Sequence, residues 1–170
     1  ASLVAFILGT TLAWINERTN TPMRRLFYAL SIVPLIIPGI LFTIAWIMLA
    51  SPKIGLINLV LQSWFGLDTP PFNIYSMWGM IWVDGLHYSP MAFLLMSSAF
   101  RAMDPSLEES ATMSGSGVLN TLYRITLKLA LPAILATVLT LFIRAIESFE
   151  VPALLGLPAG IQVFTSAIYQ

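Results

Sequence analysis

The stretch "LFYALSIVPLIIPGILFTIAWIMLA", Leu26 to Ala50, carries no charge and decides the class of fold. It is longer than the roughly 20 apolar residues that a helix needs to cross the hydrocarbon core of a bilayer. Pro34, Pro38 and Gly39 interrupt it, but membrane helices tolerate such residues where neighbouring helices satisfy the freed backbone groups. The run therefore predicts a membrane-spanning segment.

The composition of the whole chain also indicates a membrane protein. Of its 170 residues, 58% are hydrophobic and 9% are charged, whereas soluble domains carry about 25% charged residues. The chain has no cysteine, which excludes disulfides and thiolate-bound metals. Its formal net charge is zero, and we expect no nucleic acid among its partners.

Three further apolar runs are candidates for membrane spans: Ala1 to Ile15, Tyr75 to Phe100 and Leu127 to Phe149. Together with the first run they predict an all-α, polytopic transmembrane helix bundle with about four to five spans. We expect this bundle to be a single domain over residues 1–170. The run at the start is short and does not begin with methionine, so we expect the chain to be a fragment of a longer protein.

The basic residues predict the orientation of the bundle. Most of the cations lie in two segments, 16–25 and 101–128, which two membrane crossings separate. The positive-inside rule places both segments on the cytoplasmic side. These cations are Arg18, Arg24, Arg25, Arg101, Arg124 and Lys128.

The long connection from Ser51 to Ile74 then faces outward. Within it, Ile54 to Leu67 is uncharged but too short to span comfortably, so we expect a helix that lies in the interface or re-enters the bilayer. Trp64, Trp78 and Trp82 fit the tryptophan belt at a membrane boundary.

A polar segment separates the third run from the fourth. It reads "DPSLEESATMSGSGVLNTLYRITLKLALP" and begins at Asp104. Asp104 before Pro105 is a favourable helix start, and Ser106 with Glu109 offers a second capping pair. We therefore expect a short helix at the beginning of this segment.

Two glycines divide the polar segment. Gly115 and Gly117 are expected to stop the first helix, because glycine adopts the left-handed conformation at little cost. A second helix is expected from Val118 towards Leu127. The segment thus predicts a helix, a bend and a helix on the cytoplasmic face, with a plain capped and solvated loop as the alternative.

The spacing of this segment resembles the cytoplasmic loop of the permeases of binding-protein-dependent ABC importers. In that family the loop reads Glu-Ala-Ala, three residues, Gly, nine residues, Ile, any residue, Leu, Pro. The matching positions here are Glu109, Ser110, Ala111, Gly115, Ile125 and Leu127, within a loop over residues 104–127. The sequence departs from the pattern twice, since Ser110 replaces the middle alanine and Lys128 stands where proline is usual.

The resemblance implies a role for the loop. In the family it forms a coupling helix, which sits in a groove of a separate ABC ATPase subunit and transmits the closure of that subunit to the membrane helices. A short helix with small residues can approach a groove closely, Glu109 can pair with a basic group there, and Gly115 permits the bend. The implied partners are the ATPase subunit, an extracytoplasmic substrate-binding protein, a second permease domain and the lipid bilayer of the bacterial inner membrane, with no cofactor.

The resemblance extends over essentially the whole chain. Residues 12–49 look like the opening spans of this superfamily, and residues 144–170 look like its branch of iron(III) permeases. Iron(III) or a similar small solute is therefore the expected substrate, with thiamine, phosphonate, polyamine, sulfate and molybdate as alternatives. Permease cores of this family have a further span after the region resembling Gly156 to Gln170, which we expect to lie outside this chain.

Five ionisable residues lie within or at the end of the predicted spans: Asp84, His87, Arg144, Glu147 and Glu150. Charges at membrane depth are costly and usually face a bundle interior, a cavity or a partner, which makes these residues candidates for the translocation path. Their spacing by threes lets each set share one helix face. The structural alternative is that Arg144 pairs with Glu147 and that Asp84 caps a broken helix. One histidine and scattered carboxylates do not define a metal site.

Other function classes fit the sequence less well. The chain has no G-x-x-x-x-G-K-[ST] phosphate loop, so ATP hydrolysis is expected on a partner chain. It has neither H-E-x-x-H nor G-x-S-x-G and only one histidine, which argues against an intramembrane enzyme, and no catalytic residue is predicted. A structural membrane subunit is the third class, and the intramembrane acids and the polar loop argue against it.

Overall fold

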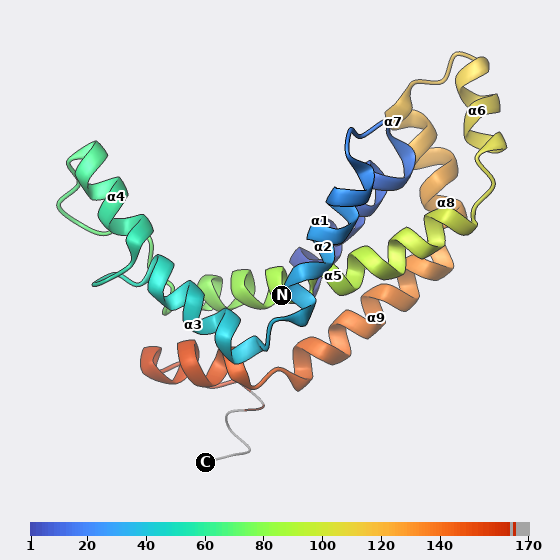
Figure 1. Cartoon of the computed structure of the whole chain (residues 1–170). Coiled ribbons are helices and arrows are strands. Elements are labelled where there is room, and N and C mark those ends of the chain that lie inside the picture. Colours follow the sequence, from blue (N-terminus) through green and yellow to red (C-terminus); the bar gives the residue numbers. More distant parts are fainter. Residues whose placement is uncertain (164, 166–170) are drawn as a thin grey trace.

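The computed structural model describes residues 1–163 and 165, and every regular element in this part of the chain is a helix (Figure 1). The all-α prediction is therefore confirmed for these residues. The end of the stretch that resembles iron(III) permeases, residues 164 and 166–170, lies outside them. The elements are α1 (Ser2–Arg18), α2 (Arg24–Ile36), α3 (Gly39–Ala50), α4 (Leu56–Phe65), α5 (Met77–Ala102), α6 (Ser106–Met113), α7 (Val118–Thr121), η1 (Leu122–Thr126), α8 (Leu127–Leu129), α9 (Leu131–Glu147), η2 (Pro152–Gly156) and η3 (Leu157–Ala159).

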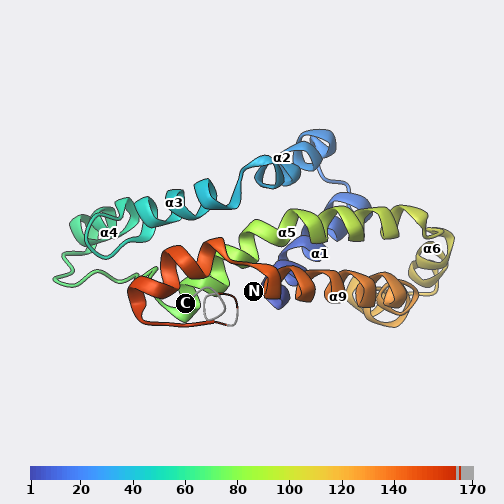
Figure 2. The ribbon, with the colours of Figure 1, turned by 90° about the horizontal axis from the view of Figure 1, so that it is seen from below.

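The long helix α5 forms the centre of the bundle, with α2 and α3 along one side and α9 along another (Figure 2). Its most extensive contact is with α1. Gly9 of α1 lies against Ala92 and the backbone of Ser89 and Phe93. Helices in a bilayer gain no hydrophobic driving force from association, so this close approach of small residues supplies much of the contact energy.

The apolar run Leu26 to Ala50 is divided into α2 and α3, whose axes bend by 100° at a short break. The break lies at Pro38. A proline disfavours the helical conformation of the residue before it, and Ile37 is accordingly extended, with φ −78° and ψ 124°. Pro34 in contrast stays inside α2.

The last predicted span, Leu127 to Phe149, is also bent. It starts as α8, turns at Ala130 and continues as α9, which has Pro132 in its first turn, where a missing N–H is harmless. Proline thus comes a few residues later than in the family pattern, after Lys128. Among the described residues no single helix is long and apolar enough to cross a bilayer, whereas α2 with α3, and residues 118–129 with α9, reach the required length and apolarity as bent pairs.

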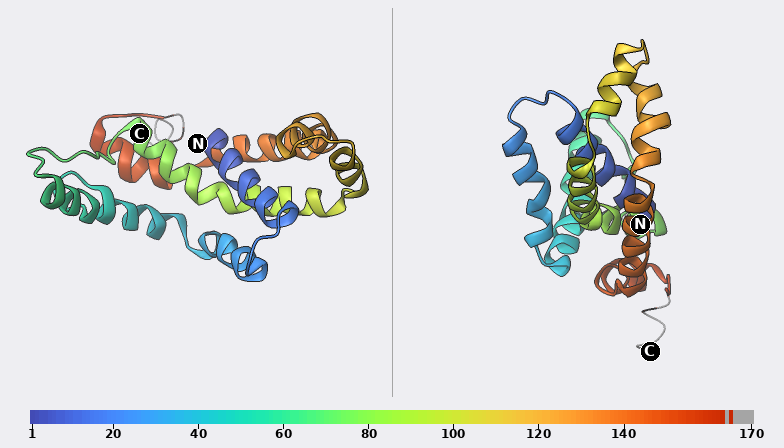
Figure 3. Two further views of the ribbon diagram at one scale, coloured as in Figure 1. Left: turned by 90° about the horizontal axis from the view of Figure 1, so that it is seen from above. Right: turned by 90° about the vertical axis from the view of Figure 1, so that its right-hand side faces the viewer.

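The two predicted cytoplasmic segments lie at the same end of the bundle, as the positive-inside rule predicts. Glu17 in the first segment forms ion pairs with Arg24 and with Arg101 of the second. Helix α6 lies at this end and α4 at the other (Figure 3). The predicted helix within Ile54 to Leu67 is thus confirmed as α4, at the end of the bundle opposite the basic segments.

Asn58 fixes α4 to the rest of this outer region. Its side chain is almost fully buried, and its Nδ2 donates to the carbonyl oxygens of Ser51 at 3.0 Å and Phe72 at 2.8 Å. Its Oδ1 accepts a hydrogen bond from the backbone N–H of Phe72 at 3.0 Å. One amide therefore closes the long connection between α3 and α5.

Much of the apolar surface of the bundle is exposed. No residue of α2 is buried, and Leu30 and Ile36 are 56% and 78% exposed. Soluble monomers rarely show contiguous apolar surface on this scale, so these faces are suited to lipid or to a further membrane chain.

Candidate functional site

The start of α6 is capped by Asp104, as predicted. The Oδ1 of Asp104 accepts a hydrogen bond from the backbone N–H of Ser106 at 2.9 Å. This hydrogen bond favours the charged carboxylate and so lowers the pKa of Asp104. The bond therefore stabilises the fold above the ordinary carboxyl pKa, and this contribution is lost as the pH falls through the lowered pKa of Asp104. The second predicted cap is wrong: the Ser106 side chain makes no capping bond to α6.

Gly115 ends α6 in a Schellman motif. Its φ is +82°, in the left-handed region. The backbone N–H of Gly115 donates to Thr112 O at 3.0 Å, and that of Ser116 donates to Ala111 O at 3.0 Å, which satisfies the last carbonyl groups of the helix. Gly117 has φ −68° and precedes α7, so its predicted left-handed role is wrong.

The residues that match the family pattern are spread along the whole loop. Glu109 and Ser110 are exposed on α6, and Ala111 is half-buried. Ile125 is half-buried in η1, a π-helical turn, and Leu127 is half-buried in α8. Such π-helical turns are rare and often occur at functional sites.

Several apolar side chains of this polar loop point away from the bundle. Met113 at the end of α6 is 91% exposed, and Leu119 of α7 is 69% exposed. Leu107 and Val118 are also exposed. An exposed helix with apolar side chains at the tip of a bundle is suited to a groove on another protein.

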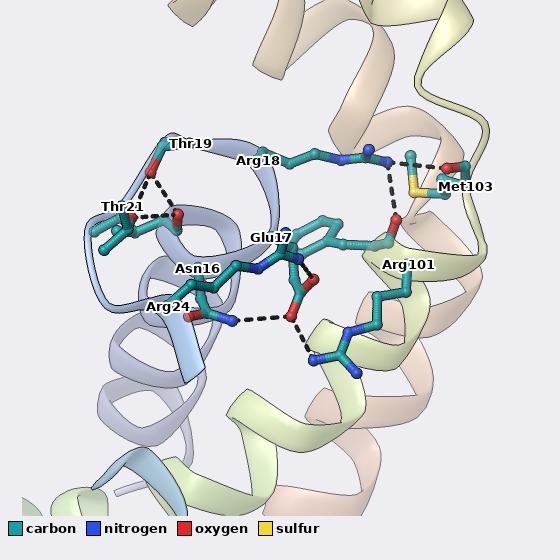
Figure 4. Close-up of polar contacts among 10 residues, drawn as sticks. Asn16, Glu17, Arg18, Thr19, Thr21, Arg24, Arg101 and Met103 are labelled. Carbon is teal, nitrogen blue, oxygen red and sulfur yellow. Dashed lines mark hydrogen bonds and ion pairs between the residues drawn. The ribbon is translucent and has the colours of Figure 1, made fainter. Parts of the chain in front are cut away.

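Arg18 ties the loop to two membrane helices. Its Nη2 donates to the carbonyl oxygens of Phe100 at 2.9 Å and Met103 at 3.2 Å, at the end of α5 (Figure 4). Its Nε lies 3.4 Å from Oε1 of Glu108 in α6. The same Glu108 oxygen accepts a hydrogen bond from Thr126 of η1 at 2.8 Å. We call Arg18, Glu108 and Thr126 the tether.

Glu17 is the centre of a second polar cluster, which joins α1, α2 and α5 (Figure 4). Its carboxylate side chain is 2% exposed, and it accepts hydrogen bonds from Asn16, Arg24 and Arg101. Neither Glu17 nor Glu108 was predicted from the sequence. The available signal for Glu17 was that it is the one acid among the arginines of residues 16–25, whereas residues 101–128 hold equal numbers of acids and cations, so no such signal marks Glu108.

All five ionisable candidates for the translocation path line one cavity of about 450 Å³ (Asp84, His87, Arg144, Glu147 and Glu150), together with Gly39, Tyr88, Ser148, Phe149 and Val151. The sequence grouped these residues only within each helix, and the structure brings α5 together with the end of α9. Arg144 Nη1 lies 3.3 Å from Glu147 Oε2, as the structural alternative predicts. The other part of that alternative is wrong, because Asp84 lies inside the continuous helix α5 and accepts a hydrogen bond from Ser148 Oγ at 3.0 Å.

His87 and Gly39 define one side of this cavity. The ring of His87 contacts those of Phe42 and Tyr88, whose centroids are 5.2 and 5.3 Å away, and its buried Nδ1 has no hydrogen-bond partner in the described structure. A Cβ atom at Gly39 would collide with the carboxylate of Glu150. The break between α2 and α3 therefore places the backbone of Gly39, which has no side chain, against the charged groups of the cavity. The described residues contain no cluster of three or more histidine or carboxylate groups able to hold a metal ion.

Comparison with known proteins gives a family for the chain. Residues 3–170 match the family described as "Binding-protein-dependent transport system inner membrane component". The galactooligosaccharides transport system permease protein GanP of Bacillus subtilis (strain 168) is 26% identical, over 100% of this chain and 44% of that protein. The molybdenum transport system permease protein ModB of Escherichia coli (strain K12) is 25% identical, over 99% and 72%. The ferric transport system permease protein FbpB of Actinobacillus pleuropneumoniae is 23% identical, over 98% and 24%.

Solved structures share the fold. A bacterial ABC transporter involved in the import of the acidic polysaccharide alginate matches with a TM-score of 0.70 at 23% identity, over 96% of this chain and 57% of that one. The alginate transporter in complex with a periplasmic protein matches with a TM-score of 0.62 at 22% identity, over 78% and 47%. The chain thus spans less than half of GanP and about a quarter of FbpB.

Proposed function

Because the chain belongs to the family of inner membrane components of binding-protein-dependent transport systems, we propose that it is part of the permease subunit of an ATP-driven ABC importer. The family predicted from the loop is thereby confirmed, and it is a family of transport components rather than of enzymes. The proposed partners are an ABC ATPase subunit, an extracytoplasmic substrate-binding protein and a second permease domain. ATP hydrolysis would take place on the ATPase subunit.

The observation that carries this proposal is the form of α6. It is a short capped helix at one end of the bundle, stopped by Gly115 and exposed on its outer side, with apolar side chains such as Met113 available for contact. In the proposed role α6 occupies a groove of the ATPase subunit. Glu109, which is exposed on α6, pairs there with a basic or hydrogen-bonding group.

The transport cycle follows from linkage. A ligand shifts a conformational equilibrium only by its differential affinity for the two states. ATP on the ATPase subunits and the loaded binding protein outside must therefore both favour the outward-facing state. The loop is the part of this chain through which ATP binding to the ATPase subunits would shift the spans towards the outward-facing state.

We expect Glu109→Ala to weaken coupling strongly and leave the bundle inserted. Loss of a hydrogen bond to a charged group is worth about 1.5–3 kcal/mol, so uptake should fall at least about tenfold. The measurement is uptake by the full-length transporter, with the amount of ATPase that co-purifies with it. Asp68→Ala, which removes an exposed carboxylate at the other end of the bundle, is the control and should change neither. Normal uptake in Glu109→Ala would refute the coupling role.

We further propose that the cavity around His87 lies on the translocation path. It carries three carboxylates (Asp84, Glu147 and Glu150) against one guanidinium (Arg144), which favours a cationic solute. Iron(III) is therefore our preferred substrate, bound transiently rather than in a closed metal site. The names of the relatives cover galactooligosaccharides, molybdenum and ferric systems, so the preference for iron rests on this charge balance and on the sequence resemblance.

We expect Glu150→Gln to reduce iron(III) uptake about tenfold, because it removes one charged contact of the cavity. The assay is uptake of labelled iron(III), and of labelled molybdate in parallel, by proteoliposomes that hold the complete transporter and its binding protein. Asp68→Asn is the matched control. Molybdate uptake that exceeds iron uptake would exclude the proposed cationic substrate. Equal iron uptake by Glu150→Gln and Asp68→Asn would exclude the cavity from the translocation path.

A further inference from the structure

A basic pocket lies where α1 ends, α2 begins and α5 ends. It has a volume of about 390 Å³ and is lined by Asn16, Arg24, Arg25, Tyr28 and Arg101. No carboxylate is among these lining residues. The pocket is distinct from both the loop residues and the cavity around His87 described above.

The start of α2 is electrostatically unusual. The N-terminus of a helix carries a partial positive charge and is stabilised by acids, yet α2 begins with Arg24 and Arg25 and has no acid in its first turn. Met23 precedes it in the left-handed conformation, with φ 57°, and offers no side-chain cap. Positive charge is thus concentrated where an anion would be favoured.

Two of the arginines are held in place by neighbours. The Glu17 carboxylate bridges Arg24 and Arg101, and the guanidinium of Arg101 lies 4.7 Å from the ring centre of Tyr28. Glu17 compensates only one of the three positive charges of the pocket. Arg25 is exposed and makes no ion pair within the described residues, so it is available to a ligand.

Asn16 is an independent sign of a missing ligand. It is only 4% exposed and lines the pocket. Its Nδ2 donates to Glu17 Oε1 at 3.0 Å, which fixes the orientation of the amide, and its Oδ1 has no partner. A buried acceptor left without a donor is costly. A ligand that carries hydroxyl groups beside an anionic group would match both Asn16 and the arginines.

We propose that this pocket binds the phosphodiester headgroup of an anionic phospholipid in the cytoplasmic leaflet. Guanidinium groups match phosphate oxygens by bidentate hydrogen bonds, and basic pockets between helices at the cytoplasmic surface bind anionic headgroups. The acyl chains would extend along α2, which has no buried residue. Phosphatidylglycerol, which adds hydroxyl groups to the phosphodiester, fits the acceptor of Asn16. The bound lipid would fasten the start of α2 to α1 and α5.

The test is native mass spectrometry of the full-length transporter, extracted from mixed phosphatidylglycerol and phosphatidylcholine membranes. We expect selective retention of phosphatidylglycerol. Arg25→Gln should lower this selectivity about tenfold, since it removes a charge-assisted hydrogen bond to the phosphate inside the pocket. Arg124→Gln is the matched control, because Arg124 is an exposed arginine of the same end that does not line the pocket, and it should retain the lipid as the wild type does.

Two further measurements distinguish the source of the anion and exclude misfolding. Inorganic phosphate at millimolar concentration should not displace the lipid, and displacement would assign the pocket to a free anion instead. The melting temperature in phosphatidylcholine alone should be the same for Arg25→Gln and the wild type. Absence of selective retention, or an equal loss of lipid selectivity in Arg124→Gln, would overturn the proposal. Misfolding does not explain a loss in Arg25→Gln, because Arg25 makes no ion pair within the described residues whose loss could unfold the bundle.

Discussion

We expect Gly115→Val to reduce uptake strongly while the bundle still inserts, and the same change at Gly117 to leave uptake intact. A Cβ atom at either glycine would have open space, with no atom within 4 Å. The two positions differ in backbone conformation, since φ is +82° at Gly115 and −68° at Gly117. A residue other than glycine in the left-handed region costs about 1–2 kcal/mol, and a β-branched residue is least suited to it.

This strain acts on the direction in which the chain leaves α6. The Schellman bonds at Gly115 fix the turn towards α7, and valine relieves its strain by breaking them. Uptake by the complete transporter should fall at least about tenfold in Gly115→Val. The assay is uptake together with the amount of each variant in the membrane. Similar uptake by both valine variants would show that the left-handed turn is not required.

Gly9→Leu is expected to prevent α1 from packing on α5 and to destabilise the whole bundle. A Cβ atom at this position would lie 2.5 Å from Ser89 O and 2.7 Å from Phe93 N. Both are backbone atoms of a helix, so the two helices must separate. Overpacking typically costs 1–3 kcal/mol, and we expect about 3 kcal/mol here because α1 and α5 form the most extensive contact.

The readout is thermal unfolding of the purified full-length protein, followed by tryptophan fluorescence, since the chain has five tryptophans. A loss of about 3 kcal/mol lowers the melting temperature of a chain of this size by roughly 10 °C. Thr11→Leu introduces the same side chain at an exposed position of α1 and should change little. Equal melting temperatures for the two variants would contradict the proposed packing role of Gly9.

Much of the helical organisation could be predicted from the sequence, because apolar runs and the distribution of cations are local properties. Such signals predict the helix–bend–helix form of residues 104–127. They also predict that Glu17 and Arg101 lie at the same end of the bundle. The 100° bend before Gly39 could not, because whether a helix continues past Pro38 depends on what surrounds the freed backbone groups.

The candidate sites divide in the same way. Spacing placed Asp84 with His87 and Arg144 with Glu147, but only tertiary packing puts α5 beside the end of α9 and so forms one cavity. The tether was missed because Glu108 is next to Glu109 in a pattern that draws attention to Glu109 alone. Pairings across 90 residues, such as Arg18 with Glu108, leave no periodic signal in a single sequence. The roles of the loop and of the cavity stay predictions.

The tether determines how α6 can move. This helix is attached at four places: by the chain to α5 and to α7, by Glu108 to Arg18 of α1, and by Glu108 to Thr126 of η1. A helix held only by its chain ends could swivel on its own. With all four attachments, a displacement of α6 is expected to displace the ends of α1 and α5 as well, by an amount that the contacts of Glu108 determine.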